Sequence, residues 1–344
     1  MSGAYVHGYH AQEHERLQDQ AGTLVELLHS DTAYPAGSRV LEAGCGVGAQ
    51  TVTLCRRSPD AHFTSIDHSP ESIGEARRRA DSAGLTNVEL RQADIFVLPF
   101  ATGSFDHVFV CFVLEHLARP VEALEILRDQ LRPGGTITVI EGDHGSAYFH
   151  PDSPAAHDAI RCQVELQRAA GGDSLIGRQL FPLMIEAGIG SVRVSPRMVY
   201  VDSSRADLVE GFTRRTFTAM IECVREQAIA AGLIEPGRFY AGVRALHRTT
   251  EADGVFCTRS SRAWASARSA EADREGPADR WWTEKLLVRG ACGTRRGQSG
   301  DQNGQHGRGR AHLHLALTHL ALGDARDDLP GHPAQNRVAL GRHG

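Results

Sequence analysis

Short apolar segments alternate with amphipathic segments along the first part of this chain, and this alternation limits the fold more than any other feature. Apolar runs bounded by turn residues predict strands, and amphipathic runs of about 10–15 residues between them predict helices. Strands separated in this way form βαβ units, in which the strands are parallel and helices cover both faces of the sheet. The predicted strands are residues 39–42, 62–66, 88–91, 107–112 and 136–141, and the predicted helices are residues 49–57, 70–83 and 120–131.

The segment that follows is mostly helical. Helices are predicted at residues 155–168 and 175–187, followed by a strand at residues 192–201. Residues 208–223 then carry an apolar stripe at helical spacing that only Thr216 interrupts, and such a stripe usually packs into a core. Because this helix falls between the last two strands of the sheet, we also expect it to cover a binding site.

The composition changes near residue 257. Residues 1–257 carry 23 basic and 33 acidic side chains, whereas residues 258–344 carry 14 basic and 9 acidic ones and contain no Ile, Phe, Tyr or Met. A final strand begins at residues 254–257 and is expected to stop at Cys257. The basic Gly/Arg/His-rich segment that follows has little with which to build a core. It reads as a disordered tail, as a frame-shifted stretch, or as a tail that binds nucleic acid or another partner.

The overall composition argues against several classes of protein. A net charge of -5 disfavours a general nucleic-acid binder. No apolar run reaches the roughly 18 residues that span a membrane, and residues 1–20 hold no secretion signal, so we expect a cytoplasmic protein without a membrane partner. The seven cysteines are widely spaced with no CxxC pair, which argues against disulfides and structural zinc, and we expect no metal site.

Residues 40–48, VLEAGCGVG, run from a strand straight into a glycine-rich turn and then a helix. Glycines let the backbone approach a ligand closely and adopt positive φ angles, and the helix N-terminus offers free N–H groups. The pattern also fits the dinucleotide fingerprint, with Gly44, Gly46 and Ala49. A nicotinamide cofactor and a plain tight turn therefore both stay open at this point.

Polar motifs at the ends of the following strands narrow this choice. Asp67 ends the second strand about 20 residues after the glycines, where a carboxylate can accept hydrogen bonds from the ribose hydroxyls of an adenosine. A simple helix-capping role for Asp67 is the alternative. Asp94 ends the third strand, where it is positioned for an adenine amino group. Residues 104–117 then contain SFDHV and LEHL, and residues 131–135 read LRPGG.

In this order the motifs resemble those of the class I S-adenosylmethionine-dependent methyltransferases, in particular a small-molecule group similar to the ubiquinone/menaquinone-biosynthesis methyltransferases. The resemblance covers residues 39–142 and extends weakly to residue 257. Dinucleotide dehydrogenases resemble only the first two motifs. The resemblance implies an α/β fold with a Rossmann-like, mostly parallel seven-stranded sheet, helices on both faces and a helical substrate cap. The motifs are ExGxGxG at residues 42–48, the ribose acid Asp67, ADxxxLPF at 93–100, FDxVxxxxxLEHL at 105–117 and LRPGG at 131–135.

Carried over position by position, the resemblance implies a site for S-adenosylmethionine as cofactor. Two features depart from the family. His68 stands where an apolar residue usually stacks on adenine, although an imidazole can stack too. The final strand that stops at Cys257 would leave the sheet with an open edge. The implied cofactor-binding residues are Glu42, Gly44, Cys45 and Gly46 at the methionine and ribose, Asp67 and His68 at the ribose, Asp94 and Ile95 at the adenine, and Phe112, Val113 and His116 on the floor of the site.

The resemblance also suggests how the chain is divided. Residues 1–36 would form an N-terminal helical lid, and residues 37–145 the S-adenosylmethionine-binding α/β core. Residues 146–257 would supply the substrate cap helices and the C-terminal strands, and residues 258–344 the basic tail.

His144 is the candidate catalytic residue, because it follows the strand at residues 136–141 on the usual ligand side of such sheets. It would take a proton from an acceptor, with Asp143 or Glu141 orienting it. Substrate binding through this loop, or a metal site made of Glu141, Asp143 and His144, are the alternatives. Four further candidates for lining the site are Tyr9, Gln20, Arg178 and Gln179.

The sequence thus predicts an S-adenosylmethionine-dependent methyltransferase that acts on O, N or C of a small-molecule acceptor, in which the protein mainly aligns the reacting atoms and excludes water. Two alternatives stay open. One is a cofactor-binding but inactive methyltransferase-like protein, suggested by the unusual tail. The other is an NAD(P)-dependent oxidoreductase, which would bind a dinucleotide instead.

Overall fold

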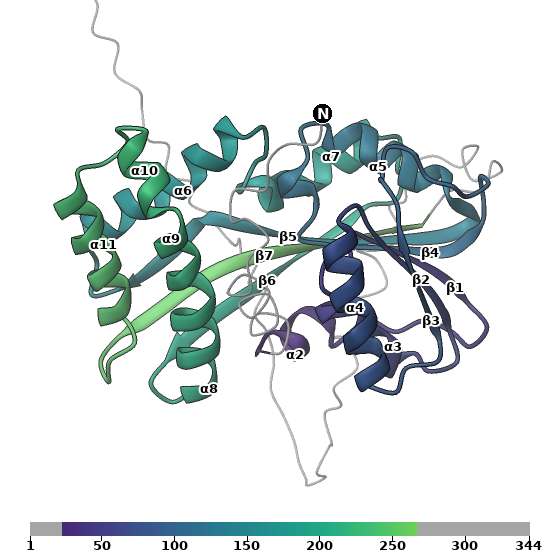
Figure 1. Cartoon of the computed structure of the whole chain (residues 1–344), viewed down its shortest axis with the longest axis horizontal. Coiled ribbons are helices and arrows are strands. Elements are labelled where there is room, and N and C mark those ends of the chain that lie inside the picture. The colour runs from purple at the N-terminus through teal and green to yellow at the C-terminus, as the bar shows by residue number, and fades with distance from the viewer. Residues whose placement is uncertain (1–22, 267–344) are drawn as a thin grey trace, which may run out of the picture. The chain divides into compact units, whose positions relative to one another are not determined.

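The computed structural model of the chain describes residues 23–266, and within them seven strands form one sheet. The strands are β1 (Arg39–Ala43), β2 (His62–Asp67), β3 (Val88–Gln92), β4 (Phe105–Cys111), β5 (Leu131–His150), β6 (Arg193–Asp202) and β7 (Val255–Ser266). Their order in the sheet is β3-β2-β1-β4-β5-β7-β6 (Figure 1). The first five strands in this order pair in parallel with their neighbours, and β7 runs antiparallel to both β5 and β6. The predicted α/β fold with a mostly parallel seven-stranded sheet is confirmed.

Helices connect the strands and cover both faces of the sheet. In Figure 1, α3 and α4 lie over the end of the sheet that holds β1 to β3, and α6 and α8 to α11 lie over the far end of β5, β7 and β6. Four helices, α4, α5, α6 and α11, begin with proline, whose fixed φ suits the first helical position. The helices are α2 (Val25–His29), α3 (Ala49–Arg57), α4 (Pro70–Ser82), α5 (Pro120–Asp129), α6 (Pro154–Ala169), α7 (Leu180–Glu186), α8 (Ala206–Leu208), α9 (Ala219–Cys223), α10 (Arg225–Ala230), α11 (Pro236–Arg248), the short η1 (Leu114–His116) and η2 (Ile176–Gln179), and the π-helix η3 (Val209–Thr218).

Two apolar clusters pack against the two faces of the sheet. The first joins Val40 of β1 and Phe109 of β4 to α2, α3, α6, η3 and α11. The second joins Leu41 of β1 and Val108 of β4 to α5 and α7. Consecutive residues of one strand belong to different clusters because successive strand side chains point to opposite faces. The helices on both sides thus leave one end of the sheet uncovered, where the carboxyl ends of β1 to β5 lie together. We call this end the shared edge.

β7 corrects the prediction that the last strand stops at Cys257. The strand continues to Ser266 and pairs with both neighbours as far as Trp264, which lies opposite Thr138 of β5 and Arg193 of β6. Its second half is well buried, since Ala263 has no exposed surface. Residues 258–266 therefore belong to the sheet, and the edge that was expected to be open is occupied.

The second half of β7 could not be predicted from the sequence because it contains a run of polar residues. Arg259 and Arg262 interrupt the apolar pattern, but both side chains have acidic partners. Arg259 forms an ion pair with Asp143 of β5 at 2.8 Å. Arg262 lies 3.4 Å from Asp31, and this second pair links β7 to the segment after α2. Charged side chains in a strand can be buried when they are paired with opposite charges. From composition alone, the same residues predict an exposed segment.

β5 is much longer than the strand predicted at residues 136–141. It pairs with β4 as far as Ile140 and then continues against β7 alone, with an irregular register between Asp143 and Tyr148. His144 was predicted to follow the strand, but it lies inside β5 at this irregularity. A break in the ladder of this kind redirects side chains, and it occurs here beside the shared edge of the sheet.

The apolar stripe at residues 208–223 packs into the first cluster, as predicted, but its backbone is not an ordinary α-helix. Residues 209–218 form the π-helix η3, which continues into α9. Thr216, which interrupts the stripe, is buried. Its hydroxyl donates a hydrogen bond of 2.7 Å to the carbonyl of Gly211, five residues earlier. π-helical segments are rare and often lie at functional sites.

Parts of the predicted division of the chain lie outside the described residues. These are residues 1–22 of the predicted lid, with Tyr9 and Gln20, and residues 267–344 of the predicted tail. From the lid segment, the structure describes the helix α2, whose buried Leu28 packs in the first cluster. Within residues 23–266, no helix is long and apolar enough to cross a membrane.

The second half of β7 is tested by Ala263→Asp in the full chain. A carboxylate at this fully buried position has no partner, so we expect the free energy of unfolding to fall by at least about 3 kcal/mol. Ser266→Asp, at the end of the strand, should change it by less than about 0.5 kcal/mol. Chemical denaturation measures both values. Equal stability of the two variants would contradict the placement of residues 258–266 in the sheet.

Candidate functional site

The turn between β1 and α3 is built from glycines in the left-handed region of φ. Gly44, Gly46 and Gly48 have φ angles of 76°, 53° and 76°. The N–H of Gly44 donates to the carbonyl of Ile66 at 2.8 Å, which ties the turn to β2. A Cβ on Gly44 would lie 2.4 Å from a methyl carbon of Val113, whereas a Cβ on Gly46 would meet no atom within 4 Å. Gly44 thus permits close packing within the protein, and Gly46 leaves the outer side of the turn open.

Asp67 ends β2 with its carboxylate held against this turn. Its Oδ2 accepts a hydrogen bond from the N–H of Gly46 at 2.9 Å, and its Oδ1 accepts one from the N–H of Ser69 at 2.9 Å. The cap of α4 is Ser69, so a role of Asp67 as the helix cap is excluded. The ring of His68 is largely exposed, and its Nδ1 lies 3.5 Å from Asp67 Oδ1. Both side chains therefore reach the shared edge of the sheet beside the turn.

Glu42 lies beneath the turn and is only 2% exposed. Its Oε2 accepts hydrogen bonds from the hydroxyls of Thr51 at 2.7 Å and Ser65 at 2.6 Å, which fastens α3 and β2 to β1. Burial raises the pKa of Glu42 to about 7. Burial likewise raises the pKa of the Cys45 thiol, so this cysteine stays a neutral packing residue.

Asp94 and Ile95 follow β3 at the same edge. The N–H of Ala93 donates to the carbonyl of Asp67 at 3.0 Å, which joins the loops after β2 and β3. Asp94 is exposed and its Oδ1 accepts from the N–H of Phe96 at 2.9 Å, whereas Ile95 is buried. The residues predicted to contact ribose and adenine thus lie on neighbouring loops.

The turn after β4 rests on a buried carboxyl group from β5. Phe112 has a φ of 57°, which is unusual for a bulky residue, and the N–H groups of Val113 and Leu114 both donate to Oε1 of Glu141, at 3.0 and 2.8 Å. Burial, with the nearby charge of Glu115, raises the pKa of Glu141 to about 8. Glu141 is therefore largely uncharged at neutral pH, and it fixes the turn that also packs against Gly44.

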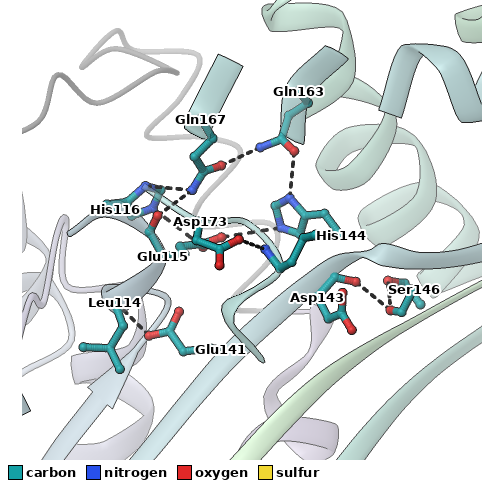
Figure 2. A network of polar contacts seen from close by, with 12 residues as sticks. Leu114, Glu115, His116, Glu141, Asp143, His144, Ser146, Gln163, Gln167 and Asp173 are labelled. Carbon is teal, nitrogen blue, oxygen red and sulfur yellow. Dashed lines mark hydrogen bonds and ion pairs between the residues drawn. The ribbon is translucent and has the colours of Figure 1, made fainter. Parts of the chain in front are cut away.

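Two histidines face one carboxylate beyond this turn, as Figure 2 shows. The Nε2 of His116 lies 3.6 Å from Glu115 Oε1, and the Nε2 of His144 lies 3.7 Å from Glu115 Oε2. His144 is largely buried, and its Nδ1 lies 3.2 Å from Oε1 of Gln163 on α6. Its ring also meets the edge of the Phe217 ring from η3, with centroids 6.3 Å apart. This arrangement holds an imidazole beside a carboxylate at the shared edge, and such a pair can accept and stabilise a proton.

Asp143 does not orient His144, which corrects the prediction. Its buried carboxylate binds Arg178 through two hydrogen bonds of 2.6 and 3.0 Å, and it also accepts from Arg259 at 2.8 Å. Glu141 does not contact His144 either, because it holds the turn after β4. The carboxylate beside His144 is that of Glu115. Within residues 23–266 no three His, Cys, Asp or Glu side chains are arranged to hold a metal ion.

Residues 35–168 match the model of a family described as a methyltransferase domain. The demethylmenaquinone methyltransferase of Thermus thermophilus is 36% identical over 106 residues, which are 31% of this chain and 48% of that protein. Residues 35–168 therefore carry a methyltransferase domain.

Other similar proteins extend beyond this domain. A 37.1 kDa protein in transposon TN4556 of Streptomyces fradiae is 35% identical over 201 residues, which are 58% of this chain and 54% of that protein. This chain therefore spans about half the length of the curated relatives it matches. The structure of the YcgJ protein from Bacillus subtilis aligns with a TM-score of 0.47 and 14% identity over 75% of this chain and 100% of that protein.

The methyltransferase domain contains site residues that sequence reasoning missed. Gln163 and Gln167 are both buried and connect His144 to His116, and their spacing of four residues on one helix face was the available signal. Glu115 was part of a recognised motif, but the sequence assigned it no role. Arg178 faces Asp143, and Gln179 donates to Asp173 at 2.6 Å, so these two candidates hold loops beside the site.

The raised pKa of Glu42 predicts how the stability of the methyltransferase domain depends on pH. A pKa raised above the unfolded value stabilises the fold fully below about pH 4.5, and this contribution is lost as the pH rises through about 7. Glu42→Gln removes this titration. Between pH 5 and pH 8.5, the free energy of unfolding of the variant should therefore fall by about 3 kcal/mol less than that of the unsubstituted chain.

Chemical denaturation across this pH range measures the effect. Glu89→Gln is the matched control, because Glu89 is exposed on β3 and pairs with Arg91. It should keep the pH dependence of the unsubstituted chain. If the curves of Glu42→Gln and Glu89→Gln had the same slope, Glu42 would be ionised in the folded state at neutral pH.

Proposed function

We propose that this chain transfers a methyl group from S-adenosylmethionine to a small-molecule acceptor. The observation that carries the proposal is the carboxylate of Asp67, which is held by the N–H of Gly46 at 2.9 Å on the open side of the glycine turn. A carboxylate in this position has lone pairs left for two ribose hydroxyls. A ligand with a ribose and an adjoining charged group therefore fits this turn.

The described residues fit the cofactor in two further respects. Gly46 lies at a positive φ, and apart from its two chain neighbours no atom of residues 23–266 lies within 4 Å of the position a Cβ would take, so a ligand can approach the backbone there. Asp94 is exposed on the loop that is hydrogen-bonded to the loop of Asp67, one strand further along the edge. We assign the remaining contacts as the sequence predicts, with Glu42, Gly44 and Cys45 at the methionine and ribose, His68 at the ribose, Ile95 at the adenine, and Phe112, Val113 and His116 on the floor of the site.

S-adenosylmethionine, when bound, supplies a methyl group on a positively charged sulfur, and the reaction leaves a neutral thioether. The chain itself positions the acceptor and excludes water, and positioning of this kind can supply on the order of 7–11 kcal/mol of the barrier. The nucleophilic atom of the acceptor forms the new bond to the methyl carbon as the carbon–sulfur bond breaks. The proton of an O–H, N–H or C–H acceptor passes to Nε2 of His144, beside the carboxylate of Glu115.

A small acceptor suits the surroundings of His144. The π-helix η3 contributes Phe217 and α6 contributes Gln163, so helices from two insertions pack directly against the imidazole. The acidic composition of residues 1–257 also disfavours nucleic acid as the acceptor. A cytoplasmic location stays a prediction from the sequence.

The alternative of an inactive, cofactor-binding protein rested on the unusual tail, which was expected to begin after Cys257. β7 continues to Ser266, so the described sheet has all seven strands and the motive for this alternative weakens. The NAD(P)-dependent alternative rested on the first two motifs, the glycine turn and the ribose acid Asp67, and not on the three motifs that follow. Neither is favoured by a specific contact among residues 23–266.

Cofactor binding is tested by calorimetry with S-adenosylmethionine and S-adenosylhomocysteine on the full chain. Asp67→Ala removes the charged hydrogen bonds to the ribose, so we expect both ligands to bind about 10- to 100-fold more weakly. Asp60→Ala is the matched control, because Asp60 is an exposed acid just before β2, and its affinity should equal that of the unsubstituted chain. No binding by the folded, unsubstituted chain would refute the proposal, and binding of NADH in its place would favour the oxidoreductase.

The role of His144 is tested by formation of S-adenosylhomocysteine with a panel of phenols, amines and carbon acids. His144→Gln removes the proton acceptor, so we expect kcat to fall by roughly 100- to 10,000-fold while cofactor affinity stays the same. His62→Gln, an exposed histidine on β2, is the control and should retain full turnover. Full turnover by His144→Gln would show that the acceptor needs no base at this position.

A further inference from the structure

Two buried glutamines on α6 form a continuous row of hydrogen bonds between His116 and His144 (Figure 2). Nε2 of Gln167 donates to the main-chain carbonyl of Glu115 at 2.9 Å, and Nε2 of Gln163 donates to Oε1 of Gln167 at 2.6 Å. Oε1 of Gln163 lies 3.2 Å from Nδ1 of His144, and Nε2 of Gln167 lies 3.4 Å from Nδ1 of His116. The two histidines are thus joined through one amide pair.

The chemistry of these groups determines which group donates and which accepts in each hydrogen bond of the row. A main-chain carbonyl only accepts, so Gln167 has to present its NH2 group to Glu115 and its oxygen to Gln163. Gln163 then donates to that oxygen and turns its own oxygen toward His144. Because an amide oxygen cannot donate, Nδ1 of His144 has to carry a proton, and in the neutral ring Nε2 has the free lone pair.

The same row sets the opposite tautomer at His116. The NH2 group of Gln167 faces Nδ1 of His116, so this nitrogen has to accept. The ring proton of neutral His116 is then on Nε2, which faces Glu115 Oε1 at 3.6 Å. The carboxylate of Glu115 therefore has a proton donor on one side and the basic nitrogen of His144 on the other, 3.7 Å from Oε2.

We propose that Gln163 and Gln167 are positioning residues that fix His144 as the Nδ1–H tautomer, so that its Nε2 receives the proton of the acceptor and Glu115 stabilises the imidazolium that forms. This inference rests on the proposed function, in which His144 is the proton acceptor. It adds the reason why one of the two histidines is the base. His116 has its Nε2 occupied by a proton, so it cannot take the same role in its neutral form.

The groups that face His144 support this assignment. Glu115 of η1 is the carboxylate nearest to the ring, and Gln163 of α6 is neutral. Phe217 of η3 contributes an apolar ring edge, and the carbonyl of Ser174 accepts from the main-chain N–H of His144 at 3.0 Å. The adjacent Asp143 of β5 is bound by two arginines, Arg178 of η2 and Arg259 of β7, which offset its charge. A proton on Nε2 of His144 thus meets the charge of Glu115 directly.

The test uses the full chain labelled with 15N-histidine and long-range 1H–15N correlation spectra at pH 8. We expect His144 to have a protonated Nδ1 and a bare Nε2, and His116 to have the reverse, with the signals assigned through His144→Gln and His116→Gln. His29 is an internal control, because its Nε2 lies 2.6 Å from Oε1 of Gln50 and should stay protonated in every variant. A protonated Nε2 on His144 would overturn the proposal whatever the activity of the protein.

Substitution of the row then links the tautomer to turnover. Gln163→Leu removes the acceptor for Nδ1, so the signals of His144 should show a mixture of tautomers, and kcat should fall roughly 10- to 100-fold with cofactor affinity unchanged. Gln163→Glu loses the donor to Oε1 of Gln167 but keeps an oxygen acceptor for Nδ1 of His144. It should therefore restore the Nδ1–H tautomer, and its negative charge should move the acidic limb of the pH profile to higher pH. Glu165→Gln, on the exposed side of α6 where Glu165 pairs with Arg168, is the matched control for the helix and should change neither measurement.

The outcomes separate the two proposals. An unchanged His144 tautomer in Gln163→Leu would overturn the role of the glutamine row, even in a protein that methylates its acceptor normally. Absence of cofactor binding in the unsubstituted chain would instead overturn the proposed function, and the role of His144 as base would fall with it.

Discussion

The hydrogen-bond ladder of β7 is the feature on which both halves of the described structure depend. β7 pairs antiparallel with β5 on one side and with β6 on the other, so β6 is joined to the sheet only through it. Its two faces also belong to different cores, because Phe256 packs with the helices of the first cluster and Ala263 packs with those of the second. Its arginines reach acids on other elements, among them Asp143 beside the site. Loss of this one strand would therefore separate the cap helices from the parallel core and release the end of β5 that holds His144.

Several buried acids lie near the shared edge, and the fold accommodates Asp143, Glu42 and Glu141 in two different ways. Asp143 is bound by two arginines, Arg178 and Arg259. Glu42 and Glu141 have no basic partner, and burial raises the pKa of each, to about 7 and about 8. At neutral pH these two groups serve mainly as hydrogen-bonding scaffolds beneath the turns. Asp94 is exposed at this edge, and Asp67, which is partly buried beside the glycine turn, lies on the neighbouring loop.

The cofactor half of the site could be predicted from the sequence because its determinants are local. The positive φ angles of Gly44 and Gly46 follow from residue type, and the position of Asp67 follows from a strand that ends within a few residues of it. The strands β1 to β4 and the helices α3 to α5 were predicted within a few residues for the same reason. The prediction for β7 was wrong because the pairing of Arg259 with Asp143 joins residues more than a hundred positions apart. A polar run reads as a loop until such partners are known.

The acceptor half of the site has the opposite character, and this explains why the motifs do not name the acceptor. His144 lies at an irregular point of β5, and the groups that surround it come from η1, α6 and η3. Nothing near His144 in the sequence indicates that Gln163 or Phe217 will touch it. Packing between distant elements sets these contacts, so they can change while the glycine turn and Asp67 stay the same. Evolution of a new acceptor in such a fold requires changes in the insertions around His144, whereas the cofactor edge is constrained by the local geometry of three parallel strands.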